Sequence, residues 1–327
     1  MRRREFITLL SGAAAWPLAA RAQQGERMRR IGVLLFGREG NPNALDYIAE
    51  FRQRLQELGW IEGRNLRIDV RFAGGDADRL RAYAAELVAL APDVLVGRGP
   101  APRALQQATS TLPIVFTDTT DPVGGGLVAS LARPGGNITG FAGEEYTTSS
   151  KQLELLKEIA PGVTRVAVIR DPTAPGQQAR FGMVQGAANV LRVDVRPIDP
   201  RTADAIERDV AALARGPGGG LLVPPSSTAN LHSDLIIGLA ARHRLPAVYA
   251  DRDWVVNGGL ISYGPVLTGT SRLAAGYVDR ILRGEKPADL SVQSPTKFEF
   301  VINRKTAAAI GLEIPPSMLA RADEVIK

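Results

Sequence analysis

The chain of 327 residues contains no cysteine and only two histidines. The absence of thiols excludes disulfides, thiolate metal sites, cysteine nucleophiles and a lipid attached to an N-terminal cysteine. His232 and His243 lie eleven residues apart, without the spacing of metal ligands around them. One stands near the expected start of a helix and the other near its end, which favours capping roles. We therefore expect no metal site and no cofactor.

Several short catalytic motifs are also missing. The sequence contains no G-x-S-x-G, no G-x-x-x-x-G-K-[ST] and no H-E-x-x-H. These are the signatures of serine hydrolases, P-loop nucleotide hydrolases and zinc peptidases. Hydrophobic residues make up 45% and charged residues 23%, which are ordinary values for a folded globular protein. The composition therefore predicts a folded protein. The missing motifs indicate that it is not an enzyme of these classes.

No apolar run reaches the length of about 20 residues that a membrane-spanning helix needs. The apolar segment 6–18 is short, follows the basic residues 2–4 and precedes Ala20-Arg21-Ala22, an A-x-A cleavage pattern. These features predict an export signal over residues 1–22, cleaved near Ala22. Residues 3–7, Arg-Arg-Glu-Phe-Ile, match the twin-arginine pattern, and a general secretory signal is the alternative.

The formal net charge of +6 gives little support to a nucleic-acid partner. The predicted signal holds four arginines and one glutamate, so only about +3 remains on the rest of the chain. Those basic residues are dispersed and not interleaved with aromatic ones. We expect a solvated surface, not a nucleic-acid interface.

Apolar runs and amphipathic helical patterns alternate along the chain, which predicts an α/β protein with parallel sheets covered on both faces. With a chain of this length, two lobes are expected. The expected strands are 31–36, 66–72, 94–96, 113–116, 165–169, 193–198, 220–223, 247–249, 259–263 and, last, 297–303; helices lie between them, and the end is helical. Ligands of such sheets bind beyond the carboxyl ends of the strands.

A glycine-rich segment raises the hypothesis of a dinucleotide site. Gly124, Gly126 and Ala129 match G-x-G-x-x-[GA] after a predicted strand, and Glu144 follows about twenty residues on. However, residues 119–122 separate the strand from the glycines, whereas a dinucleotide turn follows its strand directly. We therefore expect the glycines to permit entry into a short helix that starts near Gly124.

Several segments together resemble one family. They are FRQRLQELGWIEGRNLRID (51–69), DADRLRAYAAELVALAPDVLV (76–96), DPVGGGLVASLARPGGNITGF (121–141), QLELLKEIAPGVTRVAVI (152–169), GLISYG (259–264) and YVDRILRGEKPADLSVQSPTKFEFVINRKTAAAIGL (277–312). They are similar to the substrate-binding components of ABC transporters, in the tryptophan/tyrosine-binding, type I periplasmic family.

The resemblance implies two Rossmann-like lobes joined by three crossovers, which carry over to positions near 140–144, 264–266 and 286–290. Lobe 1 would comprise residues 28–142 and 266–286, and lobe 2 residues 143–265 and 287–327. It also implies a monomeric, non-enzymatic periplasmic protein that delivers a small solute to an inner-membrane ABC permease. An amino acid or aromatic compound is the solute class that relatives imply.

Eight residues at strand ends or crossovers are the expected ligand contacts. Lobe 1 would supply Arg98, Thr117, Asp118 and Asp121, and lobe 2 Asp171, Ser226, Asp251 and Tyr263. Relatives commonly place Thr or Ser in the loop that holds Arg98, so this arginine either grips an anionic group or is solvated. Asp121 and Asp171 precede prolines, where turn formation is an equal alternative.

Two other functions remain as alternatives. An exported NAD(P)-dependent oxidoreductase is one, supported by the glycine pattern. A ligand sensor that docks on a membrane receptor in place of a permease is the other.

Overall fold

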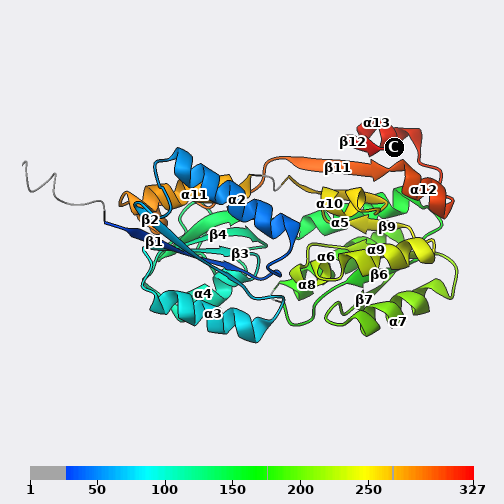
Figure 1. The fold of residues 1–327 in the computed structure, drawn as a ribbon. Coiled ribbons are helices and arrows are strands. Elements are labelled where there is room, and N and C mark those ends of the chain that lie inside the picture. The colour runs from blue at the N-terminus through cyan, green and yellow to red at the C-terminus, as the bar shows by residue number, and fades with distance from the viewer. Residues whose placement is uncertain (1–26, 175, 267–268) are drawn as a thin grey trace, which may run out of the picture.

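The computed structural model describes residues 27–174, 176–266 and 269–327, so the expected export signal lies outside the described residues. Figure 1 shows two lobes side by side, each built on its own β-sheet. Within the described chain, no helix combines the length and apolar character needed to cross a membrane.

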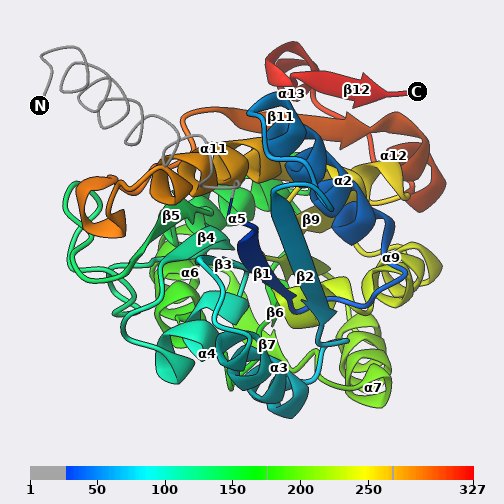
Figure 2. The same cartoon turned by 60° about the vertical axis from the view of Figure 1, so that its left-hand side comes forward.

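The first sheet is wholly parallel and has the order β2-β1-β3-β4-β5. Its strands are β1 (Arg29–Leu35), β2 (Leu66–Phe72), β3 (Val94–Arg98), β4 (Ile114–Thr119) and β5 (Ile138–Ala142). Helices α2 (Pro42–Glu57) and α11 (Thr270–Leu282) cover one face, while α3 (Ala77–Ala89) and α4 (Ala101–Ala108) cover the other (Figure 2). Burial on both faces explains the nearly continuous apolar character of these strands.

The second sheet has the order β12-β11-β10-β9-β8-β6-β7. Its strands are β6 (Arg165–Ile169), β7 (Asp194–Ile198), β8 (Gly219–Val223), β9 (Ala247–Tyr249), β10 (Ile261–Pro265), β11 (Phe298–Asn303) and β12 (Glu324–Ile326). The expectation of parallel strands holds for every pair except β10 and β11, which are antiparallel. The chain returns from the first lobe between these two strands, so β11 enters the sheet from the opposite end.

Helices also cover both faces of the second sheet. Helices α5 (Thr147–Ile159), α6 (Gln177–Leu191), α12 (Arg304–Ile310) and α13 (Pro316–Arg321) supply one apolar cluster. Helices α7 (Ala203–Ala214), α8 (Ser227–Asn230), α9 (Ser233–Arg242) and α10 (Arg252–Val256) supply the other. His232 and His243 flank α9 at its two ends, as expected.

Local sequence signals explain the helix starts. Asn41 accepts a hydrogen bond from the amide of Ala44 at 3.2 Å, and Pro42 follows in the first turn, where its missing N–H costs nothing. Asp76 caps α3 in the same way, through the amides of Asp78 and Arg79 at 2.8 and 3.0 Å. These caps fix where the chain leaves each loop at the strand ends.

Two expectations about individual elements are wrong. The short helix expected near Gly124 is absent, because residues 121–137 form turns and bends that lead into β5. The chain end is not wholly helical, since β12 pairs with β11.

The chain also stays in the first lobe longer than the expected boundary at residue 287. The 3-10 turn η1 (Pro287–Asp289) and the residues after it lie along β5. Thr139 Oγ1 donates to the carbonyl of Leu290 at 2.5 Å, and Gln293 N donates to the carbonyl of Gly140 at 3.0 Å. Leu290 is buried in the apolar cluster under α2 and α11. Apolar burial and these hydrogen bonds therefore hold residues 287–293 against the first sheet.

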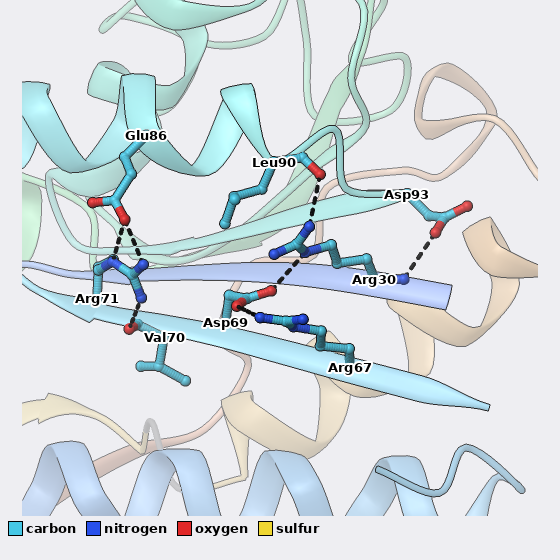
Figure 3. Close-up of polar contacts among 8 residues, drawn as sticks. All are labelled: Arg30, Arg67, Asp69, Val70, Arg71, Glu86, Leu90 and Asp93. Atoms are coloured by element: carbon cyan, nitrogen blue, oxygen red, sulfur yellow. Dashed lines mark hydrogen bonds and ion pairs between the residues drawn. The ribbon is translucent and has the colours of Figure 1, made fainter. Parts of the chain in front are cut away.

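A polar network ties β1, β2 and α3 together at the sheet edge (Figure 3). Arg30 Nε donates to Asp69 Oδ2 at 2.7 Å, and Arg30 Nη1 donates to the carbonyl of Leu90 at 3.1 Å. The amide of Arg30 donates to Asp93 Oδ2 at 2.8 Å. Charged side chains thus lie along the outer strand β2 and its neighbour, and charges on an edge strand disfavour pairing with another chain.

The two faces of α2 predict a matched pair of stability changes. Leu55 is fully buried, so Leu55→Ala should lower the free energy of unfolding by about 2–5 kcal/mol. Leu45, on the same helix, is 49% exposed, so Leu45→Ala should change it by less than about 0.5 kcal/mol. Urea denaturation of both variants measures the difference, and equal losses would contradict the described face of α2.

Candidate functional site

The loops at the carboxyl ends of the strands bring the two lobes into contact. Asn43 Nδ2, in the first lobe, donates to Asp253 Oδ2 in the second at 2.7 Å. Arg180 Nη2, on α6, lies 3.5 Å from Thr120 Oγ1, which follows β4. A Cβ built on Gly75 would lie 2.3 Å from Leu231, so backbone and side chain also meet closely here. The lobes are therefore closed on each other at the expected ligand-binding edge.

Arg98 and Asp118 form an ion pair on the first-lobe side of this interface. Arg98 Nε donates to Asp118 Oδ2 at 2.6 Å, and the guanidinium lies 4.9 Å from the centre of the Tyr47 ring. Asp118 has a φ of 55° at a break in the register of β4 with β5. This bulge leaves Asp118 Oδ1 buried without a hydrogen-bond partner. Asp118 and Tyr47 therefore already engage Arg98, whose side chain remains 32% exposed.

A second ion pair lies where the chain first crosses to the second lobe. Glu144, two residues after β5, pairs through Oε1 with Arg180 Nη1. Both side chains are almost completely buried, with exposures of 1% and 2%. Arg180 Nη1 also donates to Ser149 Oγ at 2.8 Å, and its guanidinium lies 5.2 Å from the Tyr146 ring centre. Glu144 Oε2 and Arg180 Nε have no partner.

Asp251 connects the two ion pairs electrostatically. It caps α10, accepting from the amide of Asp253 at 3.2 Å. Burial raises the pKa of Asp251 to about 6, aided by the charge of Asp253 and opposed by backbone hydrogen bonds and by Arg98. Burial likewise raises the pKa of Glu144 to about 7, against the opposing effect of Arg180 and with a contribution from Asp251. Asp251 is thus within electrostatic range of both Arg98 and Glu144.

The other expected site residues have local partners. Thr117 is fully buried, 3.0 Å from the hydroxyl of Tyr47, so it positions this ring beneath Arg98. Asp121 Oδ1 accepts from the amide of Gly124 at 2.8 Å and shapes the turn there. Tyr263 stacks on Phe298 with ring centres 5.8 Å apart and packs, partly buried, against the second-lobe core.

The two remaining residues from the second lobe are also held in their own loops. Asp171 accepts from Thr173 N and Oγ1 at 2.8 and 2.6 Å, and its other oxygen accepts from Thr228 Oγ1 at 2.7 Å. Ser226 caps α8 through the amide of Ala229 at 3.2 Å. Of the eight expected residues, Arg98 and Asp118 form an ion pair, and the charge of Asp251 adds to the rise in the pKa of Arg98.

Sequence reasoning missed Arg180 and did not assign Glu144 to a solute site. Arg180 shares the buried face of α6 with Phe181, Val184 and Ala188, so a charged residue in phase with an apolar stripe was the available signal. Glu144 entered only as the acidic residue of the supposed dinucleotide pattern. That pattern lacks its structural context, since no helix begins after Gly124 to receive a pyrophosphate.

Two cavities lie away from the strand ends that meet between the lobes. One cavity lies at the amino ends of the first-lobe strands, beside Arg29, Asp93 and Pro113, and the other beside α6 and β7. In the part of the chain that the structure describes, no group of three or more His, Asp or Glu side chains is arranged to hold a metal ion. The ion pairs at the strand ends make the polar interface between the lobes the candidate site.

Two α/β lobes whose strand ends face each other across charged side chains define a type I periplasmic-binding-protein fold. Residues 41–326 match the model of the ABC transporter substrate binding protein family, and the chain belongs to this family. Proteins of this family bind small solutes, work with ABC permeases and act outside the cytoplasm.

Individual relatives agree with this assignment. A tyrosine-binding protein of Clostridioides difficile is 25% identical over 264 residues, covering 80% of this chain and 76% of the relative. A conserved domain protein of Vibrio cholerae has 29% identity and a TM-score of 0.83, over 91% of this chain and 100% of that one. An ABC domain of Streptococcus pneumonia in complex with L-Trp has 27% identity and a TM-score of 0.81, over 91% and 99%.

The raised pKa of Glu144 predicts how stability depends on pH. An acid whose pKa rises on folding stabilises the folded state most below its unfolded pKa, and this contribution is lost as pH rises through about 7. Between pH 4.5 and 8 the wild-type chain should lose up to about 3 kcal/mol that Glu144→Gln keeps. Urea denaturation across this range measures it. Parallel pH profiles for wild type and variant would show that Glu144 is ionised throughout.

Proposed function

We propose that this protein captures a small solute between its two lobes and delivers it to an ABC permease. The convergence of charged side chains from both lobes at the strand ends, around Arg98, Asp251 and Glu144, carries this proposal. Such an interface binds a solute without covalent chemistry, so we propose that the protein has no catalytic activity. A monomer suffices, because both halves of the site come from one chain.

Capture follows from a shift in the populations of open and closed forms. A solute that touches both lobes only in the closed form stabilises closure by the difference in contact energy. We take residues 28–142 with 266–293 as one moving body, and 143–265 with 294–327 as the other. The bonds between Asn43 and Asp253, and between Thr120 and Arg180, then form on closure.

The relatives guide the choice of solute. The names of two of them refer to tyrosine and L-Trp. We propose that an amino acid or a related aromatic compound is the ligand here. Residues 1–22 would direct export to the periplasm before cleavage near Ala22. A ligand sensor that docks on a membrane receptor differs from this proposal only in its partner.

A thermal-shift screen tests solute capture. A panel of amino acids, aromatic acids, nucleosides and NAD(P) is added to the purified protein. A true ligand at a hundred times its Kd should add about 2.7 kcal/mol of stability, a shift of several degrees in Tm. Native mass spectrometry identifies any solute retained from the cell. Stabilisation by NAD(P) and by no small solute would reject the proposal.

Substitution of Asp251 should weaken solute binding without a large loss of stability. Asp251→Asn keeps an oxygen that can cap α10 but removes the charge near Arg98, so solute affinity should fall about tenfold while Tm changes little. Asp194→Asn is the matched control, because Asp194 is exposed at the opposite end of its strand. Isothermal titration measures both, and equal affinities for the two variants would remove Asp251 from the site.

A further inference from the structure

Exposed cations gather at the end of the second lobe that points away from the first. The carboxyl ends of β6 to β10 face the first lobe, so the amino ends of these strands lie at the far end (Figure 1). The antiparallel β11 also ends there, because its Ile302 lies opposite Ile261, the first residue of β10. Six exposed cations precede β7, β8 and β9 or follow β11, namely Arg192, Arg215, Arg242, Arg244, Arg304 and Lys305. They are scattered along the sequence and brought to one end by the fold.

These six cations lack carboxylate partners. In the part of the chain that the structure describes, none of them forms an ion pair. The carboxylates nearby in the chain are already engaged. Asp194, at the start of β7, pairs with Arg196 at 3.1 Å, and Glu158, near the end of α5, pairs with Arg321. The six positive charges therefore remain uncompensated at this end of the lobe.

The corresponding end of the first lobe differs. Arg29 Nη1 lies 2.8 Å from Asp93 Oδ1, and Arg30 Nε lies 2.7 Å from Asp69 Oδ2 (Figure 3). The strands β1 and β2 thus begin beside compensated charges. Uncompensated charge at strand starts is therefore not a necessary consequence of this kind of sheet.

Two of the six arginines have a backbone conformation that disfavours them. Arg192 ends α6 with a φ of 55°, and Arg244 follows α9 with a φ of 51°. This left-handed region suits glycine or asparagine, and other residues adopt it at a conformational cost. A cation near the end of a helix is favourable to the helix dipole, but Arg242 already supplies one in the last turn of α9. Helix capping therefore does not explain an arginine at position 244.

An exposed apolar side chain lies next to these cations. Val190, in the last turn of α6, is 82% exposed and stands two residues before Arg192. An apolar group among cations is typical of surfaces that lie on anionic membranes, where it enters the lipid boundary while the cations contact phosphates. Protein interfaces centre instead on large anchors such as tryptophan and tyrosine. The six cations and Val190 include no aromatic residue, which favours a lipid partner.

We propose that this end of the second lobe, defined by the six cations and Val190, is a docking surface for anionic phospholipid headgroups. A guanidinium group binds phosphate oxygens through paired N–H donors, and arginine keeps its charge at every physiological pH. The contact would keep the protein at a bilayer surface by electrostatic attraction. The surface is separate from the solute site, so the inference does not depend on the proposed function.

Vesicle binding tests this inference. Wild-type protein is mixed with vesicles of phosphatidylcholine alone, or of equal parts of phosphatidylcholine and phosphatidylglycerol, and bound protein is measured by co-sedimentation. The anionic vesicles should bind it and the neutral ones should not. Added salt should release it, because screening weakens the attraction between exposed charges. All proteins are purified after export and in the same form, so any contribution from residues 1–22 is common to them.

A double variant locates the contact. Arg192→Asn with Arg244→Asn removes two charges at positions whose φ suits asparagine, so Tm should stay equal or rise. Affinity for anionic vesicles should fall by about tenfold to thirtyfold. Arg133→Asn with Lys286→Asn is the matched control, because it removes two exposed cations at the far end of the first lobe. The control should bind vesicles as the wild type does.

Four outcomes overturn the inference. They are equal binding of wild type to neutral and anionic vesicles, no binding to either, an equal loss in both double variants, and unchanged vesicle binding in the Arg192→Asn, Arg244→Asn variant. A lower Tm in the last case would assign these arginines to helix capping. Binding of polyglutamate but not of vesicles would assign the surface to an acidic protein partner and also overturn it. Solute affinity should be the same in all variants, so solute capture is judged separately.

Discussion

The buried ion pair between Glu144 and Arg180 is the contact on which the arrangement of the lobes depends. It lies two residues after the last strand of the first sheet and joins the first crossover to α6 of the second lobe. Taking two charges out of water costs several kcal/mol each, and one ion-pair contact repays this only when the remaining polar atoms are satisfied. Here one atom on each side chain is not satisfied. A pair that is incomplete by itself is explained if a third group, the solute, completes it.

Two glycines allow the backbone to approach closely at strands near this pair. A Cβ on Gly264 would lie 1.9 Å from the carbonyl oxygen of Ala250, so only glycine lets the end of β10 pass this close to the end of β9. Gly140 has a φ of 155°, and its Cβ would lie 2.1 Å from the carbonyl of Phe116. These two glycines bring Asp118, Glu144 and Asp251 to one interface from strands that belong to two different sheets.

The alternation of apolar runs and amphipathic helical patterns predicted most of the fold, because each lobe buries both faces of its sheet. Strands such as β1 and β4 are nearly continuous apolar runs, and α2 and α3 start at side-chain caps that are visible in the sequence. The failures have local causes. Residues 121–137 contain the glycines and prolines of a turn segment, which an isolated pattern match mistook for a helix start.

The candidate site was predicted less well, because strand ends identify a region and not a set of contacts. Arg98 and Asp118 do form an ion pair, and Asp251 influences the pKa of Arg98, but Asp171 and Ser226 use their polar atoms to build their own loops. Arg180 lies in the first turn of α6, beyond the strand-end loop on which the prediction relied. Its importance comes from tertiary contact with Glu144, 36 positions away in the chain, which no local pattern contains.

The side chain of Arg180 contacts both lobes. Arg180 belongs to the second lobe, yet its guanidinium lies between Glu144 at the crossover and Thr120 of the first lobe. A group that satisfies Glu144 Oε2 therefore also stabilises the position of Arg180, and with it the contact to Thr120. Because a ligand shifts an equilibrium only by its differential affinity for the two forms, a contact made through a residue that bridges the lobes is effective for closure.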